Sequence, residues 1–306
     1  MAGDPTERVL SNSTRVLCPL VTPFDDGAVD HDALATVVVH LAERGVDGFV
    51  PCGTTGEFAS LTQDERRAVV ETTVDAAPAD APVVAGAAGT AVETVRDRIA
   101  DVADAGADAA LTVSPYYVAP SDPSSNQAFF ERVVADSPIP IYLYNIPSVV
   151  DEEIAPETVE ALADRDAVVG LKDTSGDMTH VTEVLDRVPD EFEMLQGFDG
   201  QLVPGLYMGM DAGVNSLSHV IPGALNDAVE AVREGDHDRA RDSQRHSIDP
   251  LFRCGSNYGF AGTTKVMLAH LGLLDDPELR PPLELPDPDE REEIRSTLDE
   301  VRDGGK

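Results

Sequence analysis

Residues 167–177, AVVGLKDTSGD, contain an apolar, β-branched run that ends at Lys172 and passes directly into a polar loop. A short apolar run bounded by turn residues is typical of a strand buried in a parallel sheet. Seven further runs, before and after it, alternate with amphipathic stretches, which is the pattern of consecutive βα units. The sequence therefore predicts eight strands, at 16–21, 48–51, 83–85, 109–113, 139–144, 168–172, 193–196 and 213–216.

The stretches between these strands carry the marks of helix ends. TQDE at 62–65 and TAVE at 90–93 both fit the capping box, in which the first and last side chains bond to free backbone N–H groups. Gly45, Gly106 and Gly209 each stand shortly before a predicted strand, where glycine readily takes the left-handed conformation that ends a helix. Both features predict where helices begin and end, and neither points to catalytic residues.

Eight similar units favour closure into an α/β, TIM (β/α)8 barrel with a C-terminal helical appendage. A doubly wound open sheet is the alternative, but no GxGxxG turn follows the first strand. After the eighth strand the strand signal disappears, and helices are predicted at 227–253, 265–271 and 289–301. We therefore assign 13–222 to the barrel catalytic domain and 223–306 to the last barrel helix and the C-terminal helical region.

The chain is strongly acidic, because 57 Asp and Glu residues against 22 Lys and Arg residues give a formal net charge of -35. This charge repels nucleic acid and anionic membranes, so we expect neither as a partner. An acidic surface that is poor in lysine resembles that of halophilic cytoplasmic proteins, with a mesophilic acidic enzyme as the alternative. Because no long apolar run and no signal-peptide pattern occurs, we expect a soluble, cytoplasmic protein.

Cysteine and histidine show no pattern that would bind a metal. The cysteines form no CxxC pair, and no HExxH-like or Cys/His cluster occurs, so we expect neither a metal nor a cofactor. His180, His219 and His270 are expected to be structural, and Lys265 has no assigned role. We expect reduced thiols in the core or near the site at Cys18, Cys52 and Cys254.

In a barrel, chemistry is expected at the carboxyl ends of the strands, which is where Lys172 leaves the sixth predicted strand. A lysine at the end of an apolar strand is poorly hydrated, which disfavours the ammonium form and frees the amine. A neutral amine can attack a carbonyl carbon and form an imine, as in Schiff-base aldolases. A lysine that snorkels or pairs with Asp173 is the structural alternative, which the scarcity of other lysines weakens.

Polar groups also stand at three other predicted strand ends. PCGTTGE at 51–57 can form a tight turn whose N–H and hydroxyl groups suit a carboxylate, with a plain βα loop as the alternative. Tyr144 ends the fifth predicted strand, where a phenol could shuttle protons, and Tyr117 follows the fourth. Either tyrosine could instead be a packed side chain with a satisfied hydroxyl.

These motifs resemble, in order and spacing, the family of dihydrodipicolinate synthases, N-acetylneuraminate lyases and 2-keto-3-deoxygluconate aldolases. The resemblance extends from Val16 to about Leu274. The motifs that carry it are LCPLVTPF at 17–24, GTTGE at 53–57, SPYY at 114–117, YNIP at 144–147 and GLKDTSGD at 170–177.

The resemblance implies a class I pyruvate aldolase whose small-molecule substrate is a 2-oxo acid. Lys172 would form the Schiff base and Tyr144 would relay protons, while Thr54 and Thr55, with Gly53, would hold the carboxylate and join the relay. The resemblance also implies a homotetramer in which Tyr117 completes a neighbouring subunit's site. The residues that would face the substrate from later loops are Gly197, Asp199, Asn215 and Ser216.

One departure from the family bears on the substrate. The resemblance implies that dihydrodipicolinate synthases carry an arginine two residues after the proline of YNIP to bind a substrate carboxylate, whereas Val149 stands there in this chain. Because valine cannot replace a charge-assisted contact, we expect an aldolase that cleaves a 2-keto-3-deoxy sugar acid, namely 2-keto-3-deoxygluconate or its 6-phosphate, to pyruvate and an aldehyde.

Other activities remain open at this point. Within the family, the alternatives are 4-hydroxy-tetrahydrodipicolinate synthase, N-acetylneuraminate lyase and a sugar-acid dehydratase. GFDG at 197–200 lacks the second acid that the resemblance implies for the lyases. Outside the family's chemistry, a non-catalytic ligand-binding protein is the alternative.

Overall fold

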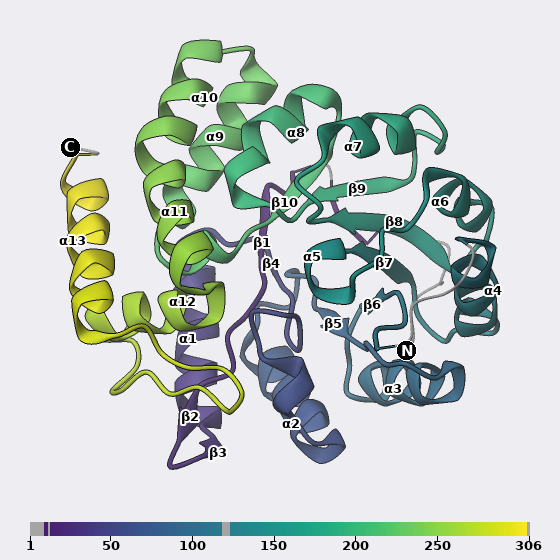
Figure 1. Ribbon diagram of the computed structural model, residues 1–306, viewed down its shortest axis with the longest axis horizontal. Helices are drawn as coiled ribbons and strands as arrows, with labels where there is room; N and C mark the ends of the chain where they lie inside the picture. The colour runs from purple at the N-terminus through teal and green to yellow at the C-terminus, as the bar shows by residue number, and fades with distance from the viewer. Residues whose placement is uncertain (1–8, 12, 118–122, 305–306) are drawn as a thin grey trace.

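The structure is a computed structural model that describes residues 9–11, 13–117 and 123–304. Eight parallel strands form its main sheet (Figure 1). The strands are β1 (Val16–Cys18), β4 (Gly48–Phe49), β5 (Val84–Gly86), β6 (Ala109–Val113), β7 (Ile141–Asn145), β8 (Val168–Asp173), β9 (Glu193–Gln196) and β10 (Ala212–Val214).

The order of the strands shows that the sheet closes on itself. The hydrogen-bonded order is β4-β1-β10-β9-β8-β7-β6-β5, which leaves β4 and β5 as the two edges. A parallel bridge between Phe49 of β4 and Val83, just before β5, joins these edges. The predicted α/β, TIM (β/α)8 barrel is therefore confirmed.

Each predicted strand is present, although some are shorter than expected. The first ends at Cys18 rather than residue 21 because Pro19 has no N–H to donate to the ladder. A short antiparallel hairpin formed by β2 (Phe24–Asp25) and β3 (Ala28–Val29) was not predicted. Two-residue strands are too short to show a periodicity.

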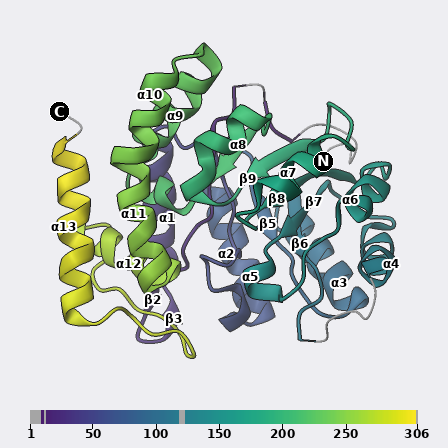
Figure 2. The ribbon, with the colours of Figure 1, turned by 45° about the horizontal axis from the view of Figure 1, so that its top comes forward.

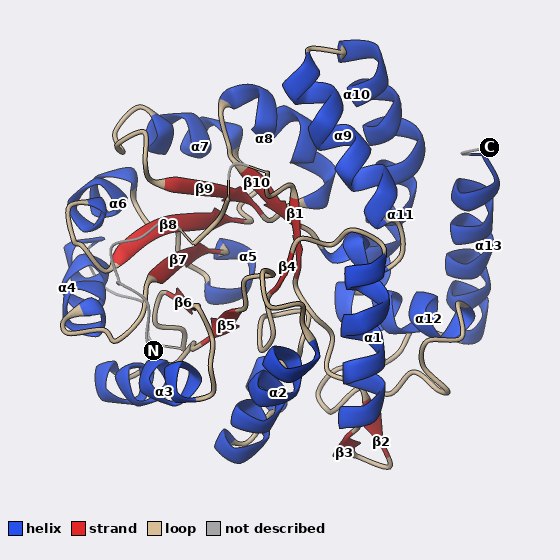
Figure 3. Ribbon diagram, turned by 180° about the vertical axis from the view of Figure 1, so that it is seen from behind, coloured by secondary structure: helices blue, strands red, loops and turns tan. Residues whose placement is uncertain are grey.

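Helices surround the barrel on its outer side, as the view from behind also shows (Figure 3). The barrel helices bury one apolar face each against the strands. They are α1 (His31–Glu43), α2 (Gln63–Ala76), α3 (Val92–Asp104), α4 (Pro123–Val134), α6 (Pro156–Ala163), α7 (Met178–Leu185), α8 (Leu202–Met208) and α9 (Pro222–Glu234). The short helix α5 (Pro147–Val150) directly follows β7, and its Val150 packs with residues of the barrel interior.

The helix ends confirm one capping box and correct the other. Thr62 and Glu65 form the predicted reciprocal cap of α2. The prediction at 90–93 is wrong, because α3 is capped at Ala91 and no side chain bonds to its first turn. The helix begins one residue later than expected, which moves the Thr90 hydroxyl out of the capping position. Gly45, Gly106 and Gly209 do have positive φ, at 83°, 94° and 111°.

The C-terminal region is more divided than the sequence predicted. The expected helix at 227–253 is broken after α9 by Gly235, which has a φ of 75°. The further elements are α10 (His237–Ser243), a π-helical turn (Gln244–Ile248), α11 (Asp249–Tyr258), α12 (Phe260–His270) and α13 (Pro288–Gly304). Figure 2 shows α13 at the outer edge of this appendage. The boundary at 222/223 stays a prediction.

Side chains fill the barrel interior near the amino ends of the strands. Tyr142 and Glu193 are fully buried there, and the Tyr142 hydroxyl donates to the Glu193 carboxylate. The N–H of Leu10 donates to the other oxygen, Oε1, at 3.1 Å. Because this end is packed, ligand access is left to the carboxyl ends of the strands. Within the described ranges, no helix is long and apolar enough to cross a membrane.

Candidate active site

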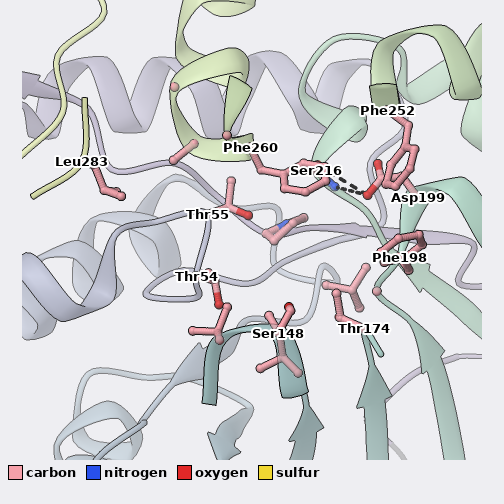
Figure 4. A pocket seen from close by; sticks show the side chains of 18 of the residues that line it. Thr54, Thr55, Ser148, Thr174, Phe198, Asp199, Ser216, Phe252, Phe260 and Leu283 are labelled. Atoms are coloured by element: carbon pink, nitrogen blue, oxygen red, sulfur yellow. Dashed lines mark hydrogen bonds between the residues drawn. The ribbon is translucent and has the colours of Figure 1, made fainter. Parts of the chain in front are cut away.

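A pocket of about 260 Å³ lies at the carboxyl ends of the strands (Figure 4). Loops that follow the strands form one side of it, and the C-terminal region forms the other, through residues of α11, α12 and the segment between α12 and α13. Seven of the predicted site residues line this pocket, namely Lys172, Tyr144, Thr54, Thr55, Gly197, Asp199 and Ser216.

Lys172 and Tyr144 meet because their strands are neighbours. The two residues pair in register across β7 and β8, and the Lys172 Nζ atom lies 4.1 Å from the centre of the Tyr144 ring. Lys172 is 4% exposed, and no carboxylate in the described part of the chain forms an ion pair with it. The predicted alternative, in which Lys172 pairs with Asp173, is therefore wrong.

Asp173 points away from Lys172 because successive strand side chains face opposite sides. Its Oδ1 atom accepts hydrogen bonds from Ser175, and its Oδ2 atom accepts one from the Asn145 amide at 2.7 Å. The Nδ1 atom of His180 lies 3.3 Å from the same Oδ2 atom. These contacts tie the ends of β7 and β8 together behind the pocket.

His180 is a member of this network that the sequence did not reveal. It is buried, and its Nε2 atom lies 2.8 Å from the Ile154 carbonyl oxygen, so both ring nitrogens face acceptors. Burial lowers its pKa, but Asp173 and the Ile154 carbonyl outweigh burial and raise the pKa to about 9. Nothing in the local sequence pattern could have placed His180 beside Asp173.

Gly197 leaves the space that the Lys172 side chain occupies. A Cβ atom at residue 197 would lie 2.7 Å from Lys172 Cε and 2.1 Å from Thr174 Oγ1. Any larger residue would displace the lysine or the threonine. Gly197 therefore lines the pocket and, because it has no side chain, leaves room for Lys172.

The loop at residues 53–57 presents two threonines to the pocket. Thr54 and Thr55 line it, whereas Gly53 does not, so the predicted role of Gly53 in substrate binding stays a prediction. The loop is folded by hydrogen bonds from Gly56 N to Gly53 O and from Glu57 N to Thr54 O, both at 3.1 Å. Among the described residues, no carbonyl accepts from the N–H groups of Thr54 or Thr55. Free N–H and hydroxyl donors of this kind suit a carboxylate.

Asp199 and Ser216 come from the loops after β9 and β10. The Asp199 carboxylate accepts from Leu217 N at 2.9 Å, from Ser216 N at 3.3 Å and from Ser216 Oγ at 3.4 Å (Figure 4). Burial raises the pKa of Asp199 to about 6, although these donors oppose the rise. Asn215 is fully buried, outside the pocket lining, and donates to the Gln196 carbonyl at 3.3 Å. The predicted substrate contact of Asn215 stays a prediction.

Tyr117 does not reach this pocket. Its side chain is 98% exposed, and its backbone has a φ of 84°, which is uncommon for a residue other than glycine. The following residues 118–122 lie outside the described part of the chain. That Tyr117 completes a second subunit's site stays a prediction.

The remaining lining is mostly uncharged, and part of it was not predicted. Lys172 is the one cationic side chain among the described residues that line the pocket. Ser148 and Val149 lie in α5, directly after β7, and the Thr174 hydroxyl is buried without a hydrogen-bond partner in the described chain. The C-terminal region adds side chains that strand-end reasoning could not find, among them Phe252, Phe260, Leu279 and Leu283.

The other predicted structural roles agree with the structure where it describes them. His219 is buried, accepts from Val21 N at 3.2 Å and contacts the Ser216 carbonyl at 2.7 Å, and burial lowers its pKa to about 4. The three cysteines are buried and form no disulfide with one another. Within the described residues, no group of His, Cys, Asp and Glu could hold a metal ion.

Comparison with known proteins places this site in a family. Residues 12–301 match the model of the dihydrodipicolinate synthetase family. Relatives named 4-hydroxy-tetrahydrodipicolinate synthase include that of Methanothrix thermoacetophila, which is 36% identical over 287 residues, 93% of this chain and 95% of the relative. That of Natronomonas pharaonis is 36% identical over 290 residues, 93% of this chain and 96% of the relative.

Solved structures agree with the sequence relatives. Dihydrodipicolinate synthase from Aquifex aeolicus matches with a TM-score of 0.90 at 30% identity, over 94% of this chain and 98% of that chain. The 4-hydroxy-tetrahydrodipicolinate synthase of Methylacidiphilum fumariolicum SolV matches with a TM-score of 0.90 at 30% identity, over 95% and 96% of the two chains. The chain belongs to the dihydrodipicolinate synthetase family, whose members are pyruvate-dependent class I aldolases and lyases.

Proposed function

We propose that this protein is a class I aldolase that cleaves a 2-keto-3-deoxy sugar acid to pyruvate and an aldehyde. The observation that carries the proposal is the charge of the pocket lining, in which Lys172 is the one cation among the described residues. A lysine engaged in an imine cannot also anchor a second anionic group. The pocket therefore suits a substrate with one carboxylate and a neutral aldehyde half.

The chemistry would begin with attack by the Lys172 amine on the C2 carbonyl carbon, followed by loss of water to give a protonated imine. Tyr144 would take the proton from the C4 hydroxyl, and the C3–C4 bond would break so that its electron pair forms an enamine with the iminium carbon. The C4 aldehyde would then leave. Protonation of the enamine at C3 and hydrolysis of the imine would release pyruvate and restore Lys172.

The surrounding groups support these roles. Free donors at Thr54 and Thr55 suit the C1 carboxylate. The unpartnered hydroxyl of Thr174 and the side chain of Ser148 suit substrate hydroxyl groups. No described basic group in the lining would balance a phosphate, which favours 2-keto-3-deoxygluconate over its 6-phosphate. No metal or other cofactor is required for these steps.

The second candidate is 4-hydroxy-tetrahydrodipicolinate synthase. The names of the relatives at 36% identity favour it directly. Its aldehyde substrate carries a second carboxylate, for which the resemblance implied an arginine at the position of Val149. The exposed Val149 side chain offers no charge to such a group.

Product analysis can separate the two candidates. We would measure pyruvate release from 2-keto-3-deoxygluconate, its 6-phosphate, the galacto analogue and N-acetylneuraminate, and pyruvate consumption with aspartate semialdehyde, all in molar KCl. Cleavage of a keto-deoxy sugar acid that Lys172→Ala abolishes is the expected result. Consumption of pyruvate only with the semialdehyde would favour the synthase, and loss of water without pyruvate release would favour a dehydratase.

Three wider properties belong to the same proposal. The exposed Tyr117 suits contact with a second subunit, which supports a homotetramer. The net charge of -35 supports a halophilic, cytoplasmic protein that requires salt to screen its own repulsion. Sedimentation and unfolding measured across KCl concentrations would test both the assembly and the salt requirement.

A further inference from the structure

Lys265 and Glu57 form a buried ion pair beside the site, outside the described pocket lining. The Nζ atom of Lys265, in α12, lies 2.5 Å from Glu57 Oε1, and both side chains are 0% exposed. Neither residue is among those that line the pocket. The pair therefore calls for a role other than contact with the substrate.

The pair joins three parts of the chain that are distant in sequence. Glu57 ends the loop that carries Thr54 and Thr55, while Lys265 lies in the middle of α12. The Lys265 Nζ atom also donates to the Glu278 carbonyl at 2.7 Å, and Glu57 Oε2 accepts from the N–H of Arg280 at 3.0 Å. The third part is thus the connection between α12 and α13, at residues 271–287.

Both partners are held in a single arrangement. Glu57 has a φ of 54°, which is costly for a residue with a side chain and persists only where its contacts require it. The Phe24 ring lies under the pair, 4.3 Å from Lys265 Nζ. Each carboxylate oxygen of Glu57 has a donor, so a change in either partner would leave a buried group unsatisfied.

The two segments that the pair joins both contribute walls of the pocket. Thr54 and Thr55 lie on the carboxylate side, and Leu279, Leu283 and Glu284 bring the 271–287 connection to the rim. Movement of Glu57 would shift both walls, because its two oxygens bond to Lys265 and to the 271–287 connection. An unpaired Glu57 carboxylate would also repel a substrate carboxylate held two or three residues away in the chain.

We infer that Lys265 and Glu57 are a positioning pair that sets the carboxylate-binding loop against the 271–287 connection and so determines affinity for the 2-oxo acid. Lys265 is not a nucleophile in this role, since its Nζ atom is engaged by Glu57 and the Glu278 carbonyl. The inference rests on the proposed role of Thr54 and Thr55, but not on the identity of the aldehyde.

The test is imine trapping with pyruvate and borohydride, measured as a function of pyruvate concentration on the whole protein. In Lys265→Met, the half-saturating pyruvate concentration is expected to rise by about tenfold or more, because a displaced loop weakens oriented binding. Labelling at saturating pyruvate is expected to stay at Lys172 and to change by less than about threefold. This split between affinity and reactivity is what a merely structural pair would not produce.

Two further variants make the result decisive. Glu57→Gln keeps the volume of the side chain, so it is expected to stay folded even if Lys265→Met does not. Its half-saturating pyruvate concentration is expected to rise too, but by less than that of Lys265→Met. Arg187→Met is the matched control, since it removes contacts to Glu157 and Glu160 at 2.9 and 3.1 Å on the outer surface. Its half-saturating concentration should equal that of the unchanged protein.

The outcomes that overturn the inference are distinct from failure of the proposed function. If folded Lys265→Met or Glu57→Gln binds pyruvate as well as the unchanged protein, the pair does not position the loop. A loss of labelling at saturation with no change in half-saturation would contradict it equally. Absence of trapping in the unchanged protein would instead overturn the imine chemistry itself.

Discussion

Two buried lysines of this chain lie in opposite electrostatic surroundings. Lys265 contacts the Glu57 carboxylate at 2.5 Å and the Glu278 carbonyl at 2.7 Å. Lys172 has no carboxylate partner in the part of the chain that the structure describes, and it lines the pocket. Each lysine also lies against an aromatic ring, of Phe24 or Tyr144, at 4.3 and 4.1 Å. The ring is common to both, so the carboxylate is what distinguishes them.

This difference teaches that burial alone does not make a lysine a nucleophile. Burial lowers the pKa of Lys265, and the Glu57 carboxylate offsets part of that change. Its amine is also occupied by acceptors and has no access to the pocket. Lys172 has no carboxylate beside it in the described part of the chain, and in the pocket its amine can meet a carbonyl carbon. We therefore propose separate roles for the two residues, imine formation for Lys172 and positioning for Lys265.

The same substitution at both lysines gives the largest expected contrast. Lys172→Met is expected to abolish imine trapping with pyruvate and to lower pyruvate release on the order of 10⁴-fold or more, because the nucleophile is lost. Lys265→Met should still be labelled at Lys172. Peptide mapping after borohydride reduction measures both. A label at Lys265 in the unchanged protein would reverse the two assignments.

The free energy of unfolding should change in the opposite order, more in Lys265→Met than in Lys172→Met. Lys265→Met leaves Glu57 buried without its partner and is expected to lower the free energy of unfolding by about 3–5 kcal/mol. Lys172→Met is expected to change it by less than about 1 kcal/mol, because no buried carboxylate loses a partner. Lys265→Met combined with Glu57→Gln should recover part of the loss. Urea unfolding in KCl measures these differences, and equal losses at the two lysines would refute the comparison.

The sequence predicted the barrel, and placed Lys172 and Tyr144 at one pocket, because both predictions depend on local patterns. Apolar runs marked the strands, and residues such as Lys172 and Tyr144 stood at their ends. Because neighbouring parallel strands end at the same edge of the sheet, the proximity of Lys172 and Tyr144 followed from the fold. The error at Thr90 was one of a single residue, which decides whether a hydroxyl reaches the end of a helix.

What the sequence could not predict depends on contacts between distant segments. Lys265 and Glu57 are 208 residues apart, and nothing in the local pattern around either indicates the other. The pocket wall formed by Phe252 and Phe260 arises from the packing of α11 and α12, whose place over the barrel is set by tertiary contacts. The sequence analysis therefore left Lys265 without an assigned role.

The phenol of Tyr144 should matter separately from its ring. Tyr144→Phe keeps the ring beside Lys172 but removes the hydroxyl, so turnover is expected to fall by roughly 10²- to 10³-fold while imine trapping persists. Tyr258→Phe is the matched control, because Tyr258 also lines the pocket but its hydroxyl donates to Glu293 at 2.9 Å. Stopped-flow trapping and steady-state release separate the two steps. Equal losses in both variants would remove Tyr144 from the proton relay.

The buried His180 provides the test with the smallest expected effect, a dependence of stability on pH. Its neighbour Asp173 adjoins Lys172 in sequence yet pairs with His180, which leaves Lys172 free of a carboxylate. The pKa of His180 is about 9 in the folded protein against 6.5 for the unfolded group, so its contribution is fully present below pH 6.5 and is lost as pH rises through 9. The expected loss is at most about 3 kcal/mol.

Unfolding of the unchanged protein and of His180→Gln should be compared between pH 6 and 9.5, and the difference between them is expected to shrink as pH rises. Burial also raises the pKa of the Cys18 thiol well above its usual range and that of the Cys52 thiol to about 12, but both proteins share that effect, so it cancels in the difference. A difference that stays constant across this range would mean that His180 is uncharged. Asp173 would then be held by Asn145 and Ser175 alone, and the freedom of Lys172 from a carboxylate would depend on strand geometry rather than on a competing cation.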